Sequence, residues 1–342
     1  MRAGVFRGPR EVAVEDVEEP LVSAGGIVID VRACGICGSD LHLFNTGKAI
    51  ASGQVMGHEF AGQVAQVGDD VRGIAVGDRV AAMPLVPCWV CAPCRAGEVQ
   101  LCVQAFAPGI GFGLPGAFAE RLHIPGALVG QTVFRLPDEL GYDAGALLEP
   151  LAVAVHAVRR SGVPPGATAV VLGLGPIGQL VARVLRAGGV ERIAGVERSG
   201  FRRECAERAG IPTTAGGAAL RPALAEVLGA DAAVDVVFEC TGVPALAEQA
   251  SRLVRRGGTV TIVAVYEEPA PIDVSAFAVR EITVRGSSAY APADFAEALR
   301  LLEAGTVSAA DLVTGRAPLA ELPRALAEQA QAPRSLKVLI EP

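Results

Sequence analysis

A glycine-rich turn between an apolar strand and a helix restricts the fold more than any other feature of the sequence. Residues 169–172 are all apolar, as in a buried strand, and a helical pattern follows over residues 177–187. The glycines between them permit a tight turn, close approach of the backbone to a pyrophosphate and close packing of helix on strand. The helix N-terminus adds unpaired N–H groups that attract phosphate. The sequence therefore predicts a dinucleotide-binding turn that contains Gly173, Gly175, Pro176, Ile177 and Gly178.

The segment around this turn alternates strands and helices. A helix is expected just after Pro150, and an arginine-rich helix follows the second strand. The further apolar strands are predicted at residues 193–196, 234–238, 259–265 and 282–285. Such alternation is typical of a doubly wound parallel sheet with helices on both faces. We therefore expect an α/β dinucleotide-binding domain over residues 151–289.

Charged residues after the second strand bear on the choice of cofactor. Glu197 lies at about the distance at which an acidic residue binds the adenosine ribose hydroxyls. A carboxylate there repels the 2′-phosphate of NADP, so the sequence favours NAD. Arg198 and Arg202 follow and carry the charge that offsets this repulsion, and Glu197 alone is also compatible with a solvated loop. Val265, at the end of a later strand, is a further candidate cofactor contact.

The first part of the chain has a different pattern. Residues 1–150 are rich in Gly, Val and Pro and contain short apolar runs such as 27–31 and 64–67. This pattern predicts a compact β-rich domain of short strands. The tail of the chain is helical and then strand-like at residues 337–340, and we expect it to return to the first domain. That domain would then comprise residues 1–150 and 290–342.

Four cysteines are clustered in a lobe over residues 87–103. They follow the spacing C-x2-C-x2-C-x7-C, which can close a tetrahedral site, and they are Cys88, Cys91, Cys94 and Cys102. The alternatives are an iron–sulfur cluster, whose usual bacterial run is tighter at the last interval, and four unligated thiols. The spacing favours a structural zinc ion. Because protein atoms fill all four positions, this metal cannot bind a substrate.

Composition excludes several other classes of function. The net charge of −7 argues against a nucleic-acid partner, which requires a basic surface. No stretch has the character of a signal peptide or is long and apolar enough to span a membrane. We therefore expect a cytoplasmic protein with no membrane partner, in which clustered cysteines bind metal rather than form disulfides.

A second set of metal-binding residue types is dispersed along the chain. Cys37 lies in Gly-Ile-Cys-Gly-Ser-Asp, His58 and Glu59 are adjacent, and Glu149 lies in Leu-Leu-Glu-Pro-Leu-Ala. Each has a plausible structural role when it is considered alone. Together with the glycine turn and the cysteine lobe, they resemble the zinc-dependent medium-chain dehydrogenase/reductase family over essentially the whole chain. The resemblance is nearest to the sorbitol, butanediol and threonine dehydrogenase branch, because Glu149 stands where other alcohol dehydrogenases usually have a cysteine.

The resemblance implies a catalytic zinc ion in a GroES-like domain, beside a Rossmann domain. Cys37 and His58 match zinc ligands. Glu59 matches a carboxylate that binds zinc directly or supports the ligands, and Glu149 matches a position that coordinates directly or through water. An open position for substrate oxygen is required in turnover. The resemblance therefore implies two zinc ions per chain.

The same resemblance assigns a proton path and a cofactor contact. Ser39 matches the hydroxyl that takes the alcohol proton, and His42 matches a residue that passes it to solvent. Asp40 matches a carboxylate that orients His58. Lys337 resembles a basic residue that reaches the cofactor pyrophosphate, with Arg334 as the competing candidate.

The implied reaction is zinc-dependent, NAD-linked oxidation of a secondary alcohol to a ketone. The substrate classes are a polyol, a vicinal diol, a cyclitol or a hydroxy amino acid, and the sequence does not distinguish them. The alternatives are a zinc-free quinone or enoyl reductase on the same fold and a non-catalytic NAD-binding protein. By resemblance we expect a homotetramer or homodimer that acts on a small-molecule alcohol.

Overall fold

The chain divides into two compact units. The computed structural model describes residues 1–342 except 218–219, 230–232 and 332–334. One unit comprises Met1–Ala152 and Tyr290–Pro342, and the other comprises Val153–Ala289. Helix α3 (Tyr142–Ser161) contains the residue at which the first unit gives way to the second.

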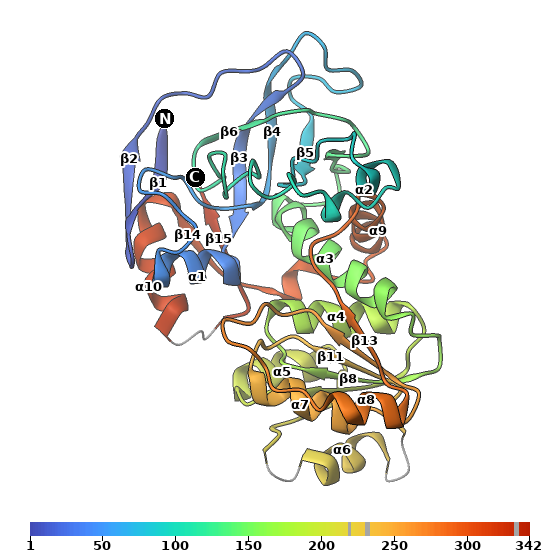
Figure 1. The fold of residues 1–342 in the computed structure, drawn as a ribbon. Helices are drawn as coiled ribbons and strands as arrows, with labels where there is room; N and C mark the ends of the chain where they lie inside the picture. Colours follow the sequence, from blue (N-terminus) through green and yellow to red (C-terminus); the bar gives the residue numbers. More distant parts are fainter. Residues whose placement is uncertain (218–219, 230–232, 332–334) are drawn as a thin grey trace. The chain divides into compact units, whose positions relative to one another are not determined.

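The second unit is built on a six-stranded parallel sheet (Figure 1). Its strands are β8 (Thr168–Leu172), β9 (Arg192–Val196), β10 (Thr213–Thr214), β11 (Val236–Glu239), β12 (Thr259–Ile262) and β13 (Thr283–Gly286). The spatial order β10-β9-β8-β11-β12-β13 places successive strands first on one side of β8 and then on the other. The direction therefore reverses between β8 and β11, where such sheets bind ligands at their carboxyl ends. The predicted parallel sheet is confirmed.

Helices cover this sheet and bury its apolar strands. They are α4 (Pro176–Ala187), α5 (Gly200–Arg208), α6 (Leu220–Leu228), α7 (Pro244–Leu253) and α8 (Val274–Arg280). Helix α4 packs on β8 and β9, and α7 packs on β11 and β12. Strand β8 is buried along its whole length, which explains why its sequence is a continuous apolar run rather than an alternating one.

The first unit contains a seven-stranded sheet and a separate hairpin. The hairpin joins β1 (Arg2–Gly8) to β2 (Glu11–Asp16). The sheet contains β3 (Ile27–Gly35), β4 (Glu59–Val67), β5 (Arg79–Ala82), β6 (Arg121–Ile124), β7 (Val133–Arg135), β14 (Val313–Pro318) and β15 (Lys337–Glu341). Strand β15, from the tail of the chain, pairs antiparallel with β3. The tail thus adds two strands, β14 and β15, to a sheet begun near the N-terminus.

Four helices and three short 3₁₀ turns complete the first unit besides its part of α3. The helices are α1 (Gly38–Thr46), α2 (Ala92–Arg95), α9 (Pro292–Glu303) and α10 (Leu322–Gln331). The turns are η1 (Val99–Leu101), η2 (Ala309–Asp311) and η3 (Leu319–Glu321). These elements are those of the described residues. The chain enters α1 directly from the end of β3, which matters for the site.

Helix α3 begins earlier than the sequence indicates. We expected a helix only after Pro150, because proline lacks the N–H that a helix interior uses. In the structure the helix starts at Tyr142 and Pro150 lies inside it. The residues of its first turns, Ala144 and Ala146–Leu148, are buried. Their apolar packing offsets the hydrogen bond that Pro150 cannot make.

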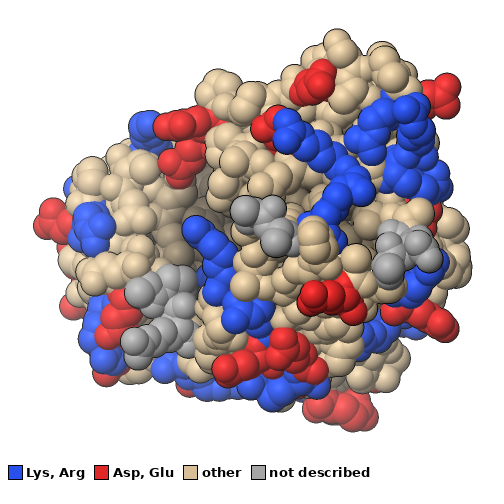
Figure 2. Space-filling view, turned by 90° about the horizontal axis from the view of Figure 1, so that it is seen from below, with Lys and Arg blue, Asp and Glu red and all other residues tan. Residues whose placement is uncertain are grey.

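Several charged side chains on the surface are paired locally. On the face drawn in Figure 2, arginine and acidic side chains lie beside one another. Arg252 contacts Glu248 at 2.5 Å, and Arg255 contacts Asp235 at 2.6 Å. No helix among the described residues is both long and apolar enough to cross a membrane.

Candidate metal centres and dinucleotide site

The fold brings three of the four predicted catalytic ligands together. Cys37 directly precedes α1, Glu59 is the first residue of β4 and His58 precedes it. Strands β3 and β4 pair so that Gly35 lies opposite Glu59. As a result, the ligand atoms of Cys37, His58 and Glu59 all lie within 4.8 Å of one another. Strand register, rather than sequence spacing, produces this convergence.

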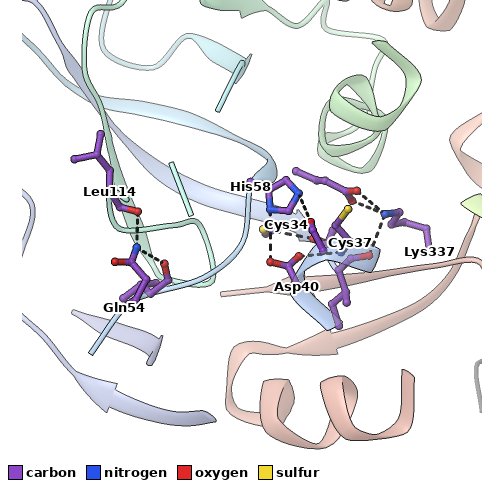
Figure 3. Close-up of polar contacts among 12 residues, drawn as sticks. Cys34, Cys37, Asp40, Gln54, His58, Leu114 and Lys337 are labelled. Atoms are coloured by element: carbon purple, nitrogen blue, oxygen red, sulfur yellow. Dashed lines mark hydrogen bonds and ion pairs between the residues drawn. The ribbon is translucent and has the colours of Figure 1, made fainter. Parts of the chain in front are cut away.

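Asp40 lies beside the His58 ring (Figure 3). Asp40 is fully buried, and its Oδ1 atom lies 3.5 Å from Nδ1 of His58, which is 4% exposed. The other carboxylate oxygen accepts the backbone N–H of Cys37 at 2.9 Å. A proton on Nδ1 directed at Asp40 leaves the Nε2 lone pair available to a metal.

The charges around His58 favour a cation. Burial lowers the pKa of His58, but Asp40 and Cys37 raise it well above its ordinary value. The cluster thus draws positive charge into a buried position. A thiolate, an imidazole and a carboxylate are also the ligand types that zinc prefers. These residues fit a zinc ion.

Ser39 and His42 lie on one face of α1, three residues apart. Ser39 Oγ lies 3.3 Å from His58 Nε2, the ring nitrogen directed away from Asp40. His42 is half-buried and its carbonyl oxygen accepts the Thr46 hydroxyl at 2.8 Å. A hydroxyl beside the metal group, with an imidazole one turn further along, is the arrangement that a proton path requires.

Glu149 lies outside the group of three ligand atoms but within electrostatic range of it. Burial raises the pKa of Glu149 to about 7, and the neighbouring Glu59 raises it while His58 lowers it. Glu149 therefore lies close to Cys37, His58 and Glu59, but its carboxylate is not part of the group whose ligand atoms all lie within 4.8 Å of one another.

Lys337 occupies a position that differs from the predicted pyrophosphate contact. Its side chain is buried, and Nζ donates to both carboxylate oxygens of Glu59 at 2.5 and 2.7 Å and to the Ile36 carbonyl at 3.0 Å (Figure 3). An ammonium group has three N–H donors, and all three are engaged here. Lys337 pairs with Glu59 instead of reaching a pyrophosphate because the buried Glu59 carboxylate would otherwise have no compensating charge. Arg334, the competing candidate, lies outside the described residues.

The cysteine lobe has the geometry of a closed tetrahedral site. The four sulfur atoms of Cys88, Cys91, Cys94 and Cys102 lie within 4.8 Å of one another, and those of Cys88 and Cys94 are 3.9 Å apart. Zn–S bonds of about 2.3 Å in a tetrahedron place sulfur atoms about 3.8 Å apart. Backbone N–H groups also point at sulfur, from Cys91 to Cys88 at 3.4 Å.

The acidity of these thiols differs within the lobe. The backbone N–H groups of Val90 and Cys91 lower the pKa of Cys88 to about 6. Burial and the neighbouring thiols raise the pKa of Cys94 to about 12. Four thiolates at these distances therefore require a cation among them, as a structural zinc site provides.

The glycine turn of the second unit is shaped for a phosphate. Gly173 has φ of 86°, and a Cβ there would lie 2.5 Å from the Thr241 side chain. A Cβ on Gly178 would overlap the carbonyl oxygen of Gly173. Gly175, by contrast, has only Arg202 nearby, and it caps the N-terminus of α4. The first and third glycines permit packing, and the second leaves the backbone open to a pyrophosphate.

Glu197 lies against this turn at the end of β9. Its carboxylate accepts the backbone N–H of Leu174 at 3.1 Å and that of Ser199 at 2.9 Å. Arg202 Nη1 lies 3.6 Å from the same carboxylate. A carboxylate has about four acceptor positions, so capacity for ribose hydroxyls remains. Arg198 is exposed beside this cluster, and Val265, 89% exposed, follows β12.

Comparison with known proteins identifies the family. Residues 23–138 match the alcohol dehydrogenase GroES-like domain, and residues 176–304 match the zinc-binding dehydrogenase domain. The chain is 33% identical to 2-dehydro-3-deoxy-L-galactonate 5-dehydrogenase of Pseudoalteromonas atlantica, over 100% of this chain and 98% of that protein. It is 36% identical to (R,R)-butanediol dehydrogenase of Bacillus subtilis, over 94% of each. The chain belongs to the zinc-dependent medium-chain dehydrogenase family.

The structure of this dehydrogenase is also similar to solved structures. A zinc-binding dehydrogenase from Sinorhizobium meliloti bound to NADP superposes with a TM-score of 0.90 at 33% identity, covering 100% of this chain and 99% of that one. The family, the GroES-like domain and the Rossmann sheet predicted from sequence are confirmed.

Three aromatic residues around the metal group of this dehydrogenase were not singled out from the sequence. The Phe112 ring lies 4.8 Å from the His58 ring, centroid to centroid, and Phe106 packs edge-on against Phe112. Tyr290 is fully buried. Burial raises the pKa of the Tyr290 hydroxyl most, and the charge of the nearby Glu149 raises it further. Phe112 and Tyr290 are far in the sequence from the His58 and Glu149 side chains that they adjoin, so no local pattern indicated their places.

Proposed function

We propose that this dehydrogenase oxidises a secondary alcohol to a ketone with NAD and two zinc ions per chain. The observation that carries this proposal is the convergence of Cys37, His58 and Glu59 beside the Ser39 hydroxyl. The similar proteins named above are dehydrogenases of a diol and of a sugar acid. We therefore assign a polyol, vicinal diol, cyclitol or hydroxy amino acid as the substrate class.

Each residue of the cluster has a distinct part in this proposal. Cys37, His58, Glu59 and Glu149 hold the catalytic zinc, and Glu59 shares its carboxylate with Lys337. Zinc in such a site acts as a Lewis acid that lowers the pKa of an alcohol. Ser39 accepts the alcohol proton and His42 passes it toward solvent. The cysteine lobe holds the second zinc.

An initial-rate screen tests the reaction class. Purified zinc-loaded protein is assayed for NADH formation with polyols, vicinal diols, cyclitols and threonine, and in parallel with NADP. Activity with at least one secondary alcohol and two bound zinc ions per chain is expected. Reduction of quinones or enones without any alcohol oxidation would support the reductase alternative instead, and binding of NAD without turnover would support the non-catalytic one.

Replacement of Ser39 by alanine is expected to lower kcat by about 10²-fold, because the proton acceptor is lost. Both zinc ions should remain bound, since Ser39 is not among the ligands. Ser39→Thr keeps the hydroxyl and should retain most of the activity. Steady-state rates with metal analysis of the three proteins check this, and an unchanged kcat in Ser39→Ala would remove Ser39 from the proton path.

Replacement of Glu197 by alanine is expected to shift cofactor preference from NAD toward NADP by about tenfold or more, because the repulsion of the 2′-phosphate is removed. Arg198→Ala is the matched control, since it removes a nearby positive charge and should disfavour NADP further. The ratio of kcat/KM values for the two cofactors is measured. A wild-type enzyme that already prefers NADP contradicts the assignment of Glu197.

We also propose that the protein is a homodimer or homotetramer. Among the described residues β13 pairs only with β12, and all four of its residues are exposed. The side chains of Val274 and Val279 in α8 and of Val284 in β13 are 71%, 69% and 43% exposed. A second copy can pair with such an edge about a two-fold axis. Light scattering should give a dimer or tetramer, and Val284→Pro should weaken it, because Thr283 and Ser287 donate their N–H groups towards β12 and the alternate residue Val284 faces the open edge; a monomeric wild type contradicts the assignment.

A further inference from the structure

Glu239, at the carboxyl end of β11, is a buried carboxylate without a cationic partner among the described residues. It is fully buried, and burial of an ionised carboxylate is costly unless hydrogen bonds compensate. One oxygen accepts the Thr241 backbone N–H at 2.8 Å and the Thr241 hydroxyl. The other accepts the Gly242 N–H at 3.2 Å and the Tyr266 hydroxyl at 2.5 Å. Every acceptor position is thus in use.

Three of the four hydrogen bonds to Glu239 come from Thr241 and Gly242 in the loop after β11, and the fourth comes from Tyr266 in the loop after β12. Tyr266 follows β12, and burial followed by the hydrogen bond to Glu239 raises its pKa, so the phenol stays a proton donor. The Glu239 backbone carbonyl also accepts from Val263 at 2.9 Å and from Ala264 at 3.2 Å. We call the pair of side chains the Glu239–Tyr266 clasp. It ties the loop after β12 to the loop after β11.

The clasp stands beside the glycine turn. Cys240 donates its N–H to the Leu172 carbonyl at 2.9 Å, and Thr241 fills the space beside Gly173. On the other side, a Cβ on Gly242 would lie 2.6 Å from the Val265 carbonyl oxygen. The loops after β8, β11 and β12 are therefore in contact at the carboxyl edge where the strand order reverses.

The position of the clasp corresponds to one half of a dinucleotide. Glu197, at the end of β9, marks the side of the adenosine ribose, and the glycine turn after β8 marks the pyrophosphate. The other half of the dinucleotide then lies over β11 and β12, on the side of the clasp. The Val265 side chain is 89% exposed, so its packing does not hold this loop. The hydrogen bonds of the clasp and of the loop backbone hold it.

We propose that Tyr266 is a positioning residue for the nicotinamide half of the cofactor. Its hydroxyl holds the loop after β12 on Glu239, so that the loop is already in place when the dinucleotide binds. This assignment rests on the dinucleotide site of the proposed function. It predicts a defect confined to ligands that contain the nicotinamide half.

The test compares two ligands and three proteins. Zinc-loaded wild type, Tyr266→Phe and the control Tyr142→Phe are titrated with NADH and with ADP-ribose, which lacks nicotinamide, by calorimetry. Tyr266→Phe should raise the Kd for NADH about tenfold, the effect of losing one hydrogen bond to a charged group, and leave the Kd for ADP-ribose unchanged within about twofold. Tyr142→Phe should change neither, since the Tyr142 ring packs against Arg79 and its hydroxyl is no part of the clasp.

Each outcome decides between distinct explanations. An unchanged NADH Kd in Tyr266→Phe overturns the positioning role, and so does an equal loss of affinity for both ligands, because that indicates a general structural effect. Glu239→Gln tests the other member of the clasp and should reproduce the selective loss. If the wild-type protein binds neither ligand, the dinucleotide site itself is wrong, and the role of Tyr266 fails with it. If the wild type binds both ligands and Tyr266→Phe binds them equally well, only the role of Tyr266 is wrong.

Discussion

Replacement of His58 by alanine is expected to lower turnover by at least about 10³-fold and to reduce bound zinc from two ions per chain to one. His58 is buried between Asp40 and the Cys37 thiol, in a cluster whose charges attract a cation. Its loss removes a ligand and leaves Asp40 without the ring it orients. Metal analysis and initial rates on the same samples measure both effects.

The control for this prediction is another histidine of the same unit. His123 contacts the Ser23 hydroxyl at 2.9 Å, and it is not part of either metal-binding group. His123→Ala should therefore keep two zinc ions and near-normal turnover. If His58→Ala also keeps two ions, the catalytic zinc is not held where we place it. If it loses both, the two metal centres are not independent.

Replacement of Lys337 by methionine is expected to lower the free energy of unfolding by about 3–5 kcal/mol, because it leaves the Glu59 carboxylate buried and unpaired. The side chains of Lys337 and Glu59 are only 2% and 1% exposed. Methionine approximates the shape of the lysine stem, so the loss of charge dominates. Urea denaturation of the protein freed of zinc gives the value, because a zinc ion held by Glu59 would itself compensate the carboxylate charge.

Two variants sharpen this measurement. Arg316→Met removes a cation from the neighbouring strand β14, where the 47% exposed side chain pairs with Glu341 and Asp143, and should cost at most about 1 kcal/mol. The double variant Lys337→Met with Glu59→Gln should recover much of the lost stability, since it removes both charges. Equal costs for Lys337→Met and Arg316→Met would mean that the buried pair contributes no more than a surface one.

Local patterns in the sequence were sufficient to predict much of the second unit. Strand β8 is buried throughout, so its apolar run was unambiguous, and the glycines that follow it have few structural alternatives. The start of α3 was missed because Pro150 is a strong local signal against a helix interior, whereas the buried residues before it extend the helix. Packing overrode the local preference there.

The two metal groups differ in how far sequence could predict them. The four cysteines of the lobe lie within one short segment, so their spacing alone indicated a closed site. Cys37, His58 and Glu59 converge through strand pairing, which spacing does not encode, and family resemblance was needed to group them. The partner of Glu59 is 278 residues away at Lys337, and no local feature could have indicated it. The same applies to Tyr266 and Glu239.

The contribution of β15 to the first unit has a consequence for synthesis of the chain. Residues Val153–Ala289 form the second unit, and they precede Lys337 in order of translation. The second unit therefore leaves the ribosome whole while the first still lacks β14 and β15. During that interval Glu59 has no ammonium partner, and the edge of β3 that β15 later covers is open. We expect the catalytic unit to complete its folding last, although most of its residues are made first.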